Sequence, residues 1–263
     1  YVDVASLTEP CIYREVKKRD STGKVTQRVA VDASNKFCRR VFSRNSWKMN
    51  GRWNGGFWMQ LPKEMRPDIY IDDVSTEEVD YSGLHPSILA WEQGQRLTGD
   101  RYDLGKLIDN SITLEEQRKV VKLLVLVAIN ARDRAKAFGA YNLKAAKPRK
   151  HNVLNALINT FIEKYPFLEA SLFTDQGVRL MNIDSQIATE VIKAFVAKDM
   201  PILPIHDSFI VKRKNVFDLQ TAMSAATIKV LGVDLEYESR HEGMMRKVTK
   251  QAMNTSDVVV MPF

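Results

Sequence analysis

Two aspartates are the strongest candidates for chemistry in this sequence. Asp80 directly follows a segment, 68–79, with the pattern of a strand, a turn and a strand, and Asp207 stands between two apolar segments, 200–205 and 209–211. Adjacent strands of one sheet would bring the two carboxylates together. Magnesium prefers oxygen ligands and keeps several waters, so two aspartates and one backbone carbonyl, that of Tyr81, are sufficient to hold it. Nucleotidyl transfer requires two such ions a few ångströms apart.

Two cations can complete such a site. Residues 113–116, Thr-Leu-Glu-Glu, form a capping box followed by apolar residues at helical spacing, which predicts one helix from about Leu114 to about Tyr141. This helix places Arg132 and Lys136 four residues apart on one face, where they can meet a triphosphate. By residue type alone, a solvated helix face is the commoner outcome for the cations, as a strand-capping turn is for the aspartates.

Paired strands and separate helices must position these residues. The predicted elements are a hairpin over 11–33, a strand, turn and strand over 68–79, helices around 152–164, 183–198 and 216–231, and a strand near 233–237.

The composition is that of a folded protein that favours anionic partners. Of 263 residues, 39 are Lys or Arg and 32 are Asp or Glu, a net charge of +7, and 44% are hydrophobic, which predicts one or two packed domains. Cys11 and Cys38 are expected to be inert thiols in a reducing cytoplasm. The longest apolar stretch, 120–131, contains Lys122 and is too short for a membrane span. Because the chain begins with Tyr, we expect a processed product or a piece of a longer protein.

Three segments resemble motifs of template-directed polymerases, in the order that those enzymes have them. Residues 79–90, Val-Asp-Tyr-Ser-Gly-Leu-His-Pro-Ser-Ile-Leu-Ala, are similar to motif A, with the Asp-Tyr-Ser string of family A DNA polymerases and the Pro-Ser-Ile string of family B. Residues 132–141 resemble motif B, with Arg-x3-Lys and Phe-Gly before a Tyr. Residues 205–209, Ile-His-Asp-Ser-Phe, resemble motif C of family A and the His-Asp-Ser-Phe of single-subunit phage-type RNA polymerases.

Further segments resemble family A elements that flank those motifs. Gly51-Arg52 with Gln60-Leu61-Pro62 and Arg66 is similar to the region before motif A. Residues 99–102 are similar to an Asp-Ile-His segment, and residues 179–186 to the helix before motif C. Six elements in the family's order cover about residues 51–211.

The resemblance implies an α+β fold, a polymerase palm whose antiparallel sheet is backed by helices, with a reduced helical fingers insertion. The implied segments are an N-terminal hairpin or thumb-like remnant over 1–50, a first part of the palm with motif A over 51–95, helical fingers with motif B over 96–178, and a second part of the palm with motif C and a C-terminal extension over 179–263.

The resemblance also implies roles for individual residues. Asp80 and Asp207, with the carbonyl of Tyr81, would bind two Mg²⁺ ions, for which Mn²⁺ can substitute, and Arg132 and Lys136 would hold the incoming triphosphate. The remaining nucleotide contacts would come from Tyr81, His85, Phe138 and Tyr141, and contacts to the primer–template duplex from Arg52, Gln60, Arg66, Arg179, Asn182, Gln186 and His206.

The implied function is that of a minimal DNA polymerase that extends a primer 3′-hydroxyl with nucleoside triphosphates, in the cytoplasm and without a membrane partner. A single-subunit RNA polymerase or primase is the alternative, because His85 stands where family A has its sugar-sensing Glu and Ser208-Phe209 matches the RNA polymerases. A further alternative is a catalytically inactive, polymerase-derived nucleic-acid-binding module. An accessory protein or additional segment would supply the thumb.

Two weaker signals have open interpretations. Trp47, Trp53, Phe57 and Trp58, interspersed with cations, either stack on single-stranded nucleic acid or pack the base of the palm. The basic segment 144–151 either contacts a template backbone or is a solvated loop.

Overall fold

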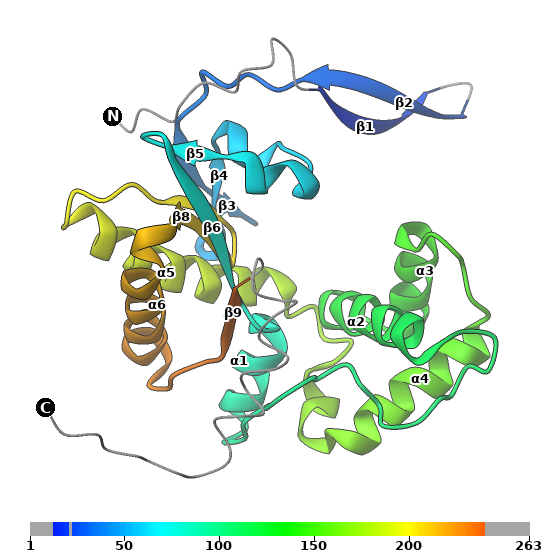
Figure 1. The fold of residues 1–263 in the computed structure, drawn as a ribbon. Coiled ribbons are helices and arrows are strands. Elements are labelled where there is room, and N and C mark those ends of the chain that lie inside the picture. Colours follow the sequence, from blue (N-terminus) through cyan, green and yellow to red (C-terminus); the bar gives the residue numbers. More distant parts are fainter. Residues whose placement is uncertain (1–12, 21–22, 240–263) are drawn as a thin grey trace, which may run out of the picture.

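In the computed structural model, residues 13–20 and 23–239 are described. Two hairpins open this part of the chain. Strands β1 (Tyr13–Asp20) and β2 (Gly23–Ala30) pair antiparallel, which confirms the predicted hairpin, and β3 (Cys38–Ser43) pairs antiparallel with β4 (Ser46–Gly55). The first hairpin extends away from the rest of the molecule, whereas β3 and β4 lie against it (Figure 1).

A five-stranded antiparallel sheet forms the centre of the molecule. Its strands are β5 (Tyr70–Ile71), β6 (Val74–Tyr81), β7 (Leu203–Ile205), β8 (Ser208–Lys212) and β9 (Tyr237–Ser239). The order is β5-β6-β8-β7, with β9 paired to the end of β6. Strands far apart in the sequence thus lie side by side.

The sheet is buried on both faces, as the alternation along β8 shows. Phe209 and Val211 belong to the main core with helices α5 (Gly177–Val196) and α6 (Val216–Leu231), whereas Ile210 belongs to a second core with Phe57 and Trp58. Successive residues of a strand point to opposite faces, so one strand contributes to both cores. Helix α1 (Leu84–Glu92) follows β6 after a short turn.

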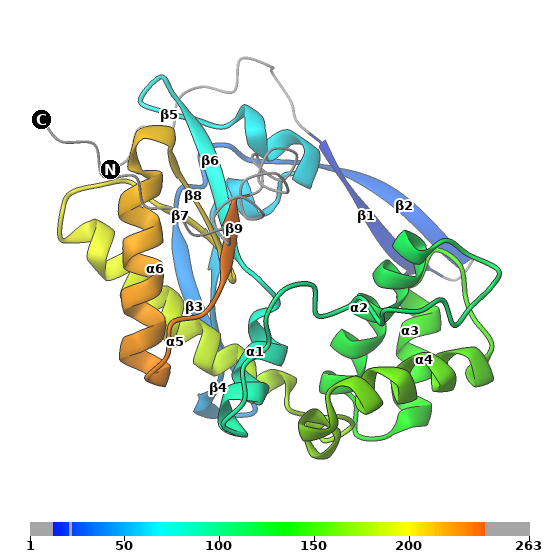
Figure 2. The same ribbon diagram turned by 60° about the horizontal axis from the view of Figure 1, so that its bottom comes forward.

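A helical lobe lies beside the sheet and is inserted between α1 and α5 (Figures 1 and 2). It comprises α2 (Leu114–Asn130), α3 (Arg134–Lys144) and α4 (His151–Lys164). The antiparallel sheet, the helices against it and the inserted lobe confirm the predicted α+β class. None of the helices in the described part of the chain combines the length and the hydropathy needed to cross a membrane.

The single helix predicted over 114–141 is wrong, because the structure divides it into α2 and α3. The chain becomes extended at Ala131, and the Asp133 side chain accepts a hydrogen bond of 2.8 Å from the backbone N–H of Lys136. An aspartate that caps a helix in this way competes with continuation of the preceding helix. The break changes where Arg132 and Lys136 lie.

Candidate active site

Asp80 and Asp207 meet at one end of the central sheet. Asp80 of β6 lies opposite Ser208 of β8 in the register, and the backbone N–H of Tyr81 donates to the carbonyl of Asp207 at 3.2 Å. Asp207 belongs to the two-residue turn between β7 and β8, in which His206 has a positive φ of 58°. Strand pairing and this tight turn therefore bring the predicted pair together.

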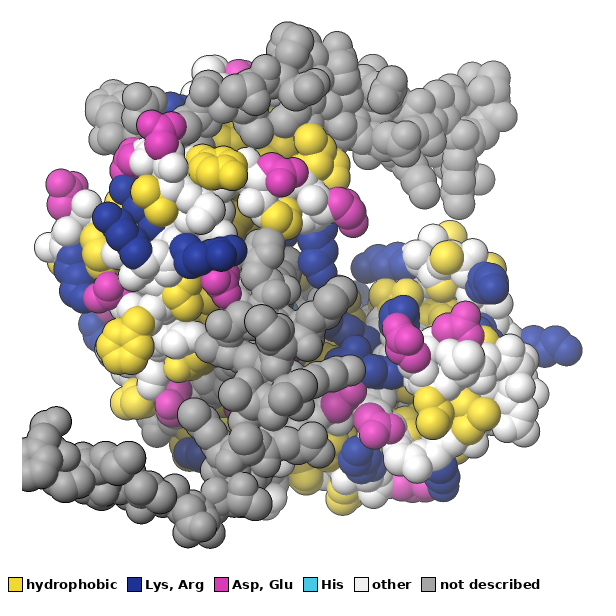
Figure 3. All heavy atoms as spheres, in the orientation of Figure 1, with side chains coloured by type: hydrophobic (Ala, Val, Ile, Leu, Met, Phe, Trp, Pro, Cys, Tyr) yellow, Lys and Arg dark blue, Asp and Glu magenta, His cyan; other side chains and the backbone are white. Residues whose placement is uncertain are grey.

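Both aspartates line one cavity of about 440 Å³ between the sheet and the helical lobe. Its walls carry three cations, Arg52, Lys122 and Lys144. Lys and Arg side chains are visible in the recess between the two parts of the molecule (Figure 3). The lining residues are Arg52, Asp80, Tyr81, Gly83, Leu84, His85, Pro86, Tyr102, Lys122, Leu126, Asn130, Lys144, Met181 and Asp207.

Helix α2 supplies the cavity wall that faces the aspartates. Lys122, Leu126 and Asn130 recur every four residues, which places them on one helical face, and all three line the cavity. The Lys122 ammonium group also lies 5.8 Å from the ring centroid of Tyr102. Sequence reasoning missed these residues, although the four-residue spacing was a signal that could have found them.

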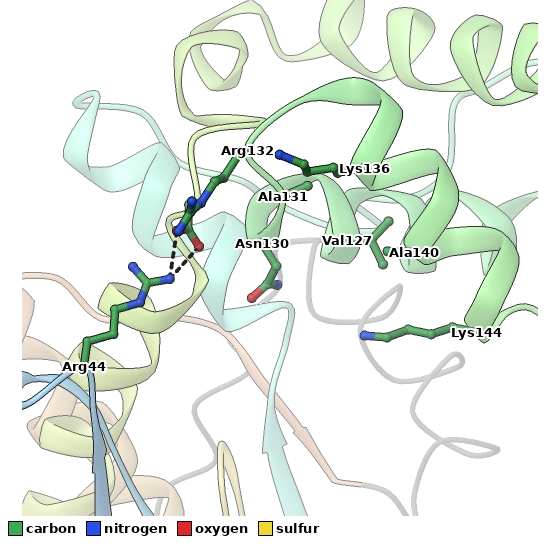
Figure 4. A pocket seen from close by; sticks show the side chains of 9 residues that line it. Arg44, Val127, Asn130, Ala131, Arg132, Lys136, Ala140 and Lys144 are labelled. Atoms are coloured by element: carbon green, nitrogen blue, oxygen red, sulfur yellow. Dashed lines mark hydrogen bonds and ion pairs between the residues drawn. The ribbon is translucent and has the colours of Figure 1, made fainter. Parts of the chain in front are cut away.

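Arg132 and Lys136 lie in an adjoining hollow of about 410 Å³ (Figure 4). This hollow shares Asn130 and Lys144 with the aspartate cavity. The Nε of Arg132 lies 3.3 Å from Asp175, and the Lys136 ammonium lies 3.2 Å from Asp133. The predicted triphosphate pair is thus next to the aspartate cavity rather than among the residues that line it.

Phe138 and Tyr141 are in the core of the helical lobe. Both side chains are buried, and the ring of Phe138 meets His151 edge to face at a centroid distance of 5.4 Å. A stacking role for these two rings stays a prediction, and both rings are packed inside the lobe. The cause is the separate helix α3, whose apolar face packs inward.

A buried carboxylate, Asp184 of α5, connects two predicted site residues. Arg52 donates to it from Nε at 2.9 Å and also from Nη2, and Nε2 of His85 lies 2.9 Å from the same carboxylate. The Asp184 side chain is fully buried. Because a carboxylate only accepts, the contact with Asp184 requires a proton on Nε2 of His85, whereas the 3.3 Å contact of the same atom with Nη2 of Arg52 requires a lone pair there. Asp184 thereby fixes the orientation of His85, and sequence reasoning did not identify it.

Burial and charge determine the protonation of His206 beside the aspartates. Burial lowers the pKa of His206 below 6.5, and the nearby Arg52 guanidinium lowers it further, against the opposing effect of Asp207. Nδ1 of this ring has no hydrogen-bond partner among the described residues. The imidazole is consequently neutral at pH 7.

The phenol of Tyr81 points away from the aspartates. Its hydroxyl donates to the carbonyl of Met223 in α6 at 2.7 Å, and burial raises its pKa above the ordinary value. Only the backbone of Tyr81 is therefore suitable for a metal or a nucleotide.

One amide predicted to contact duplex, that of Asn182, holds β4 against α5. It donates to the carbonyls of Trp47 and Asn50 at 3.0 and 2.9 Å. The exposed Gln186 donates to the Asn182 side chain at 2.9 Å within α5. Contact of both residues with duplex stays a prediction.

Two predicted duplex-contacting arginines are similarly engaged. Arg179 forms a bidentate pair with Glu92 at 2.6 and 2.8 Å, which joins α5 to α1, and Arg66 lies 3.3 Å from Glu78. Gln60 is half-buried at the end of a short 3₁₀ turn. A role in duplex binding stays a prediction for all three.

Asp80 and Asp207 offer carboxylate oxygens, the ligand type that magnesium prefers, at the sheet end. Glu238 of β9 lies directly opposite Asp80 in the register but is not among the residues that line the cavity. Opposite residues of an antiparallel pair share one face of the sheet. Within the described residues, no group of three or more His, Cys, Asp or Glu side chains is already arranged to hold a metal ion.

Among known proteins, this chain matches solved structures only. No protein-family model and no curated protein matches this chain. Among solved structures, 58 chains match, including the POL domain of Pol1 from M. smegmatis, solved in complex with a DNA primer-template and dNTP. The TM-score to that domain is 0.46 at 12% sequence identity, and the match covers 74% of this chain and 45% of that one. At this identity the likeness concerns the fold alone.

Proposed function

We propose that this chain is a template-directed nucleotidyltransferase, a DNA polymerase that extends a primer 3′-hydroxyl with deoxynucleoside triphosphates. The observation that carries the proposal is the meeting of Asp80 and Asp207 in a cavity that also presents Lys122 and Lys144. Carboxylates opposite cations are what a triphosphate and its divalent ions need.

The carboxylates would hold Mg²⁺, for which Mn²⁺ can substitute. Asp80 and Asp207 are the ligands, supported by the backbone carbonyl of Tyr81 and by Glu238 on the same face as Asp80. When bound, two such ions lower the pKa of the attacking hydroxyl and offset charge on the phosphates.

The lysines of the cavity would bind the triphosphate. Lys122 and Lys144 line the aspartate cavity itself, while Arg132 and Lys136 line the hollow that adjoins it. Ammonium groups fixed before the reaction stabilise the negative charge that develops during phosphoryl transfer. We therefore place Lys122 and Lys144 at the phosphates of the triphosphate, whereas Arg132 and Lys136, predicted for that role, line the adjoining hollow.

His85 would form the wall beside the sugar. It lines the cavity, is almost completely buried and is held by Asp184. A side chain that cannot swing aside can reject a 2′-hydroxyl by steric contact, because the cost of moving it includes loss of the Asp184 contact. This arrangement favours selection of deoxynucleotides.

Primer extension tests the proposal. Deoxyribonucleotides and ribonucleotides are offered separately, with and without primer, on DNA and RNA templates. We expect Mg²⁺-dependent, primer-dependent incorporation of deoxynucleotides that disappears in Asp80→Ala and Asp207→Ala while duplex binding persists.

Asp218→Ala is the matched control, because Asp218 pairs with Lys198 at 2.7 Å outside the cavity. Full activity in either site variant would refute the site assignment. Primer-independent incorporation of ribonucleotides would identify an RNA polymerase or primase instead. Absence of incorporation with every substrate set would refute the polymerase proposal and favour a catalytically inactive nucleic-acid-binding module.

A further inference from the structure

Three hollows follow one another along the surface, starting from the two aspartates. The aspartate cavity and the hollow of Arg132 share Asn130 and Lys144. That hollow shares Arg44 with a third one, of about 360 Å³, formed by residues 42–47 in the turn between β3 and β4. We call the second and third hollows together the outer groove. The outer groove therefore adjoins the aspartate cavity through shared lining residues.

The outer groove is strongly basic. Four cations, Arg44, Arg132, Lys136 and Lys144, line its inner hollow together with one carboxylate, Asp175. Figure 4 shows that they come from separate parts of the chain and surround the same space. Arg44 donates to both Asp175 oxygens, at 3.0 and 2.8 Å, and Arg132 donates to one of them. Two guanidinium groups are thus already oriented toward one anionic group.

Trp47 gives the far end of the groove an exposed aromatic ring. Its side chain is 79% exposed, and the ring of Phe42 contacts it edge to face at a centroid distance of 4.6 Å. The backbone there is anchored by the hydrogen bond from Asn182 to the carbonyl of Trp47. The ring is therefore held in place but not covered within the described part of the protein. An uncovered indole ring beside cations has the chemistry needed to stack on an unpaired base.

The other aromatic residues predicted as a stacking surface are not available. Phe57 and Trp58 are buried in the second core, and Trp53 donates to Thr189 of α5 at 3.2 Å. Trp47 is thus the member of that set that fits a stacking role.

We propose that the outer groove binds the unpaired template strand, a single-stranded DNA, with a base stacked on Trp47 and phosphates held by Arg44, Arg132 and Lys136. Stacking on Trp47 requires a base whose face is open, which the bases inside a duplex do not have. The groove starts beside the aspartates, as a template strand must. This inference rests on the proposed function for the identity of the strand, although the binding itself does not require catalysis.

Fluorescence anisotropy with a short labelled oligothymidylate, without nucleotide or magnesium, tests the stacking contact. One base–aromatic stack contributes about 1–3 kcal/mol, so Trp47→Ala is expected to weaken binding about tenfold, whereas Trp47→Phe retains most of the affinity. The control is Phe217→Ala, because Phe217 is also 79% exposed but lies on α6. It should bind as the unchanged protein does. Equal affinities for Trp47→Ala and Phe217→Ala would overturn the proposal.

Salt dependence tests the phosphate contacts. The slope of log affinity against log salt is about −0.7 per neutralised phosphate for single strands, so Lys136→Gln should reduce its magnitude by about that amount. Lys193→Gln is the control, because both lysines pair with an acidic residue three positions earlier and are 68% and 67% exposed. Identical slopes for the two variants would overturn the contact, and tighter binding of oligouridylate would overturn the choice of DNA. A protein that binds through Trp47 but incorporates no nucleotide would contradict only the proposed function.

Discussion

Asp184→Asn is a demanding test of the site, because it removes one charge from a buried network and almost no volume. Asp184 accepts hydrogen bonds from Arg52 and contacts Nε2 of His85, and its side chain is fully buried while that of Arg52 is 18% exposed. Breaking a buried ion pair costs about 3–5 kcal/mol, since a charge is left without its partner. Partial exposure of Arg52 lets water compensate in part, so we expect a loss of about 3 kcal/mol.

Glu92→Gln provides the matched control. Glu92 forms an equally bidentate pair with Arg179, but the two side chains are 34% and 38% exposed. Exposed pairs contribute about 0–1 kcal/mol, so this variant should lose at most that amount. Urea denaturation measures both free energies of unfolding, with unchanged m values as the check that the unfolded state is comparable. Losses that agree within about 1 kcal/mol would refute the assigned importance of burial.

A double replacement separates the charge from the packing. Arg52→Met with Asp184→Leu removes both partners, which often lowers the free energy of unfolding only slightly. Either single change leaves the other charged group buried without its partner. The double variant should therefore be more stable than either single variant.

In active protein, Asp184→Asn should also lower the preference for deoxynucleotides over ribonucleotides, because His85 loses the group that orients it. An unchanged preference would mean that Asp184 has a structural role only.

Further predictions concern Lys122 and His206. Lys122→Gln should raise KM for the triphosphate about tenfold, as loss of one charge-assisted contact does, whereas Lys119→Gln on the exposed side of the same helix should leave KM unchanged. Burial and Arg52 lower the pKa of His206 below 6.5, so between the folded and unfolded pKa values the unfolded chain binds more protons. The free energy of unfolding should therefore fall as pH drops below about 6.5 and level off below the folded pKa, and denaturation of His206→Gln should show a smaller decrease.

The sequence was sufficient to predict the strands but not their partners. The strand, turn and strand pattern over 68–79 and the apolar segment 209–211 identify strands, and the polar residues between 205 and 208 identify a turn. That Asp80 lies opposite Ser208 depends on both faces of the sheet being packed, by α5 and α6 on one side and by Phe57 and Trp58 on the other. The pairing of strands far apart in the sequence depends on packing throughout the core. From the sequence alone, only the order of the polymerase-like motifs indicated that these two strands are neighbours.

The prediction of one helix over 114–141 was wrong for a local reason. The segment has the right residue types, but the Asp133 cap starts a new helix and turns Phe138 and Tyr141 into the core. The aspartate cavity is lined instead by the preceding helix, α2. Its residues Lys122, Leu126 and Asn130 recur every four positions and lie on one face. A string of residue types fixes neither the end of a helix nor the direction of its faces.

The net charge of +7 is unevenly distributed over the folded protein. Arg52, Arg66 and Arg179, three arginines expected to contact nucleic acid, each pair with a separate carboxylate of the protein, whereas Arg44 and Arg132 of the outer groove share the single carboxylate of Asp175. The lysines of the aspartate cavity and the cations of the outer groove occur where acidic residues are outnumbered. Screening limits the reach of a charge to about 10 Å at ordinary salt, so this local excess, rather than the total, determines where a polyanion binds.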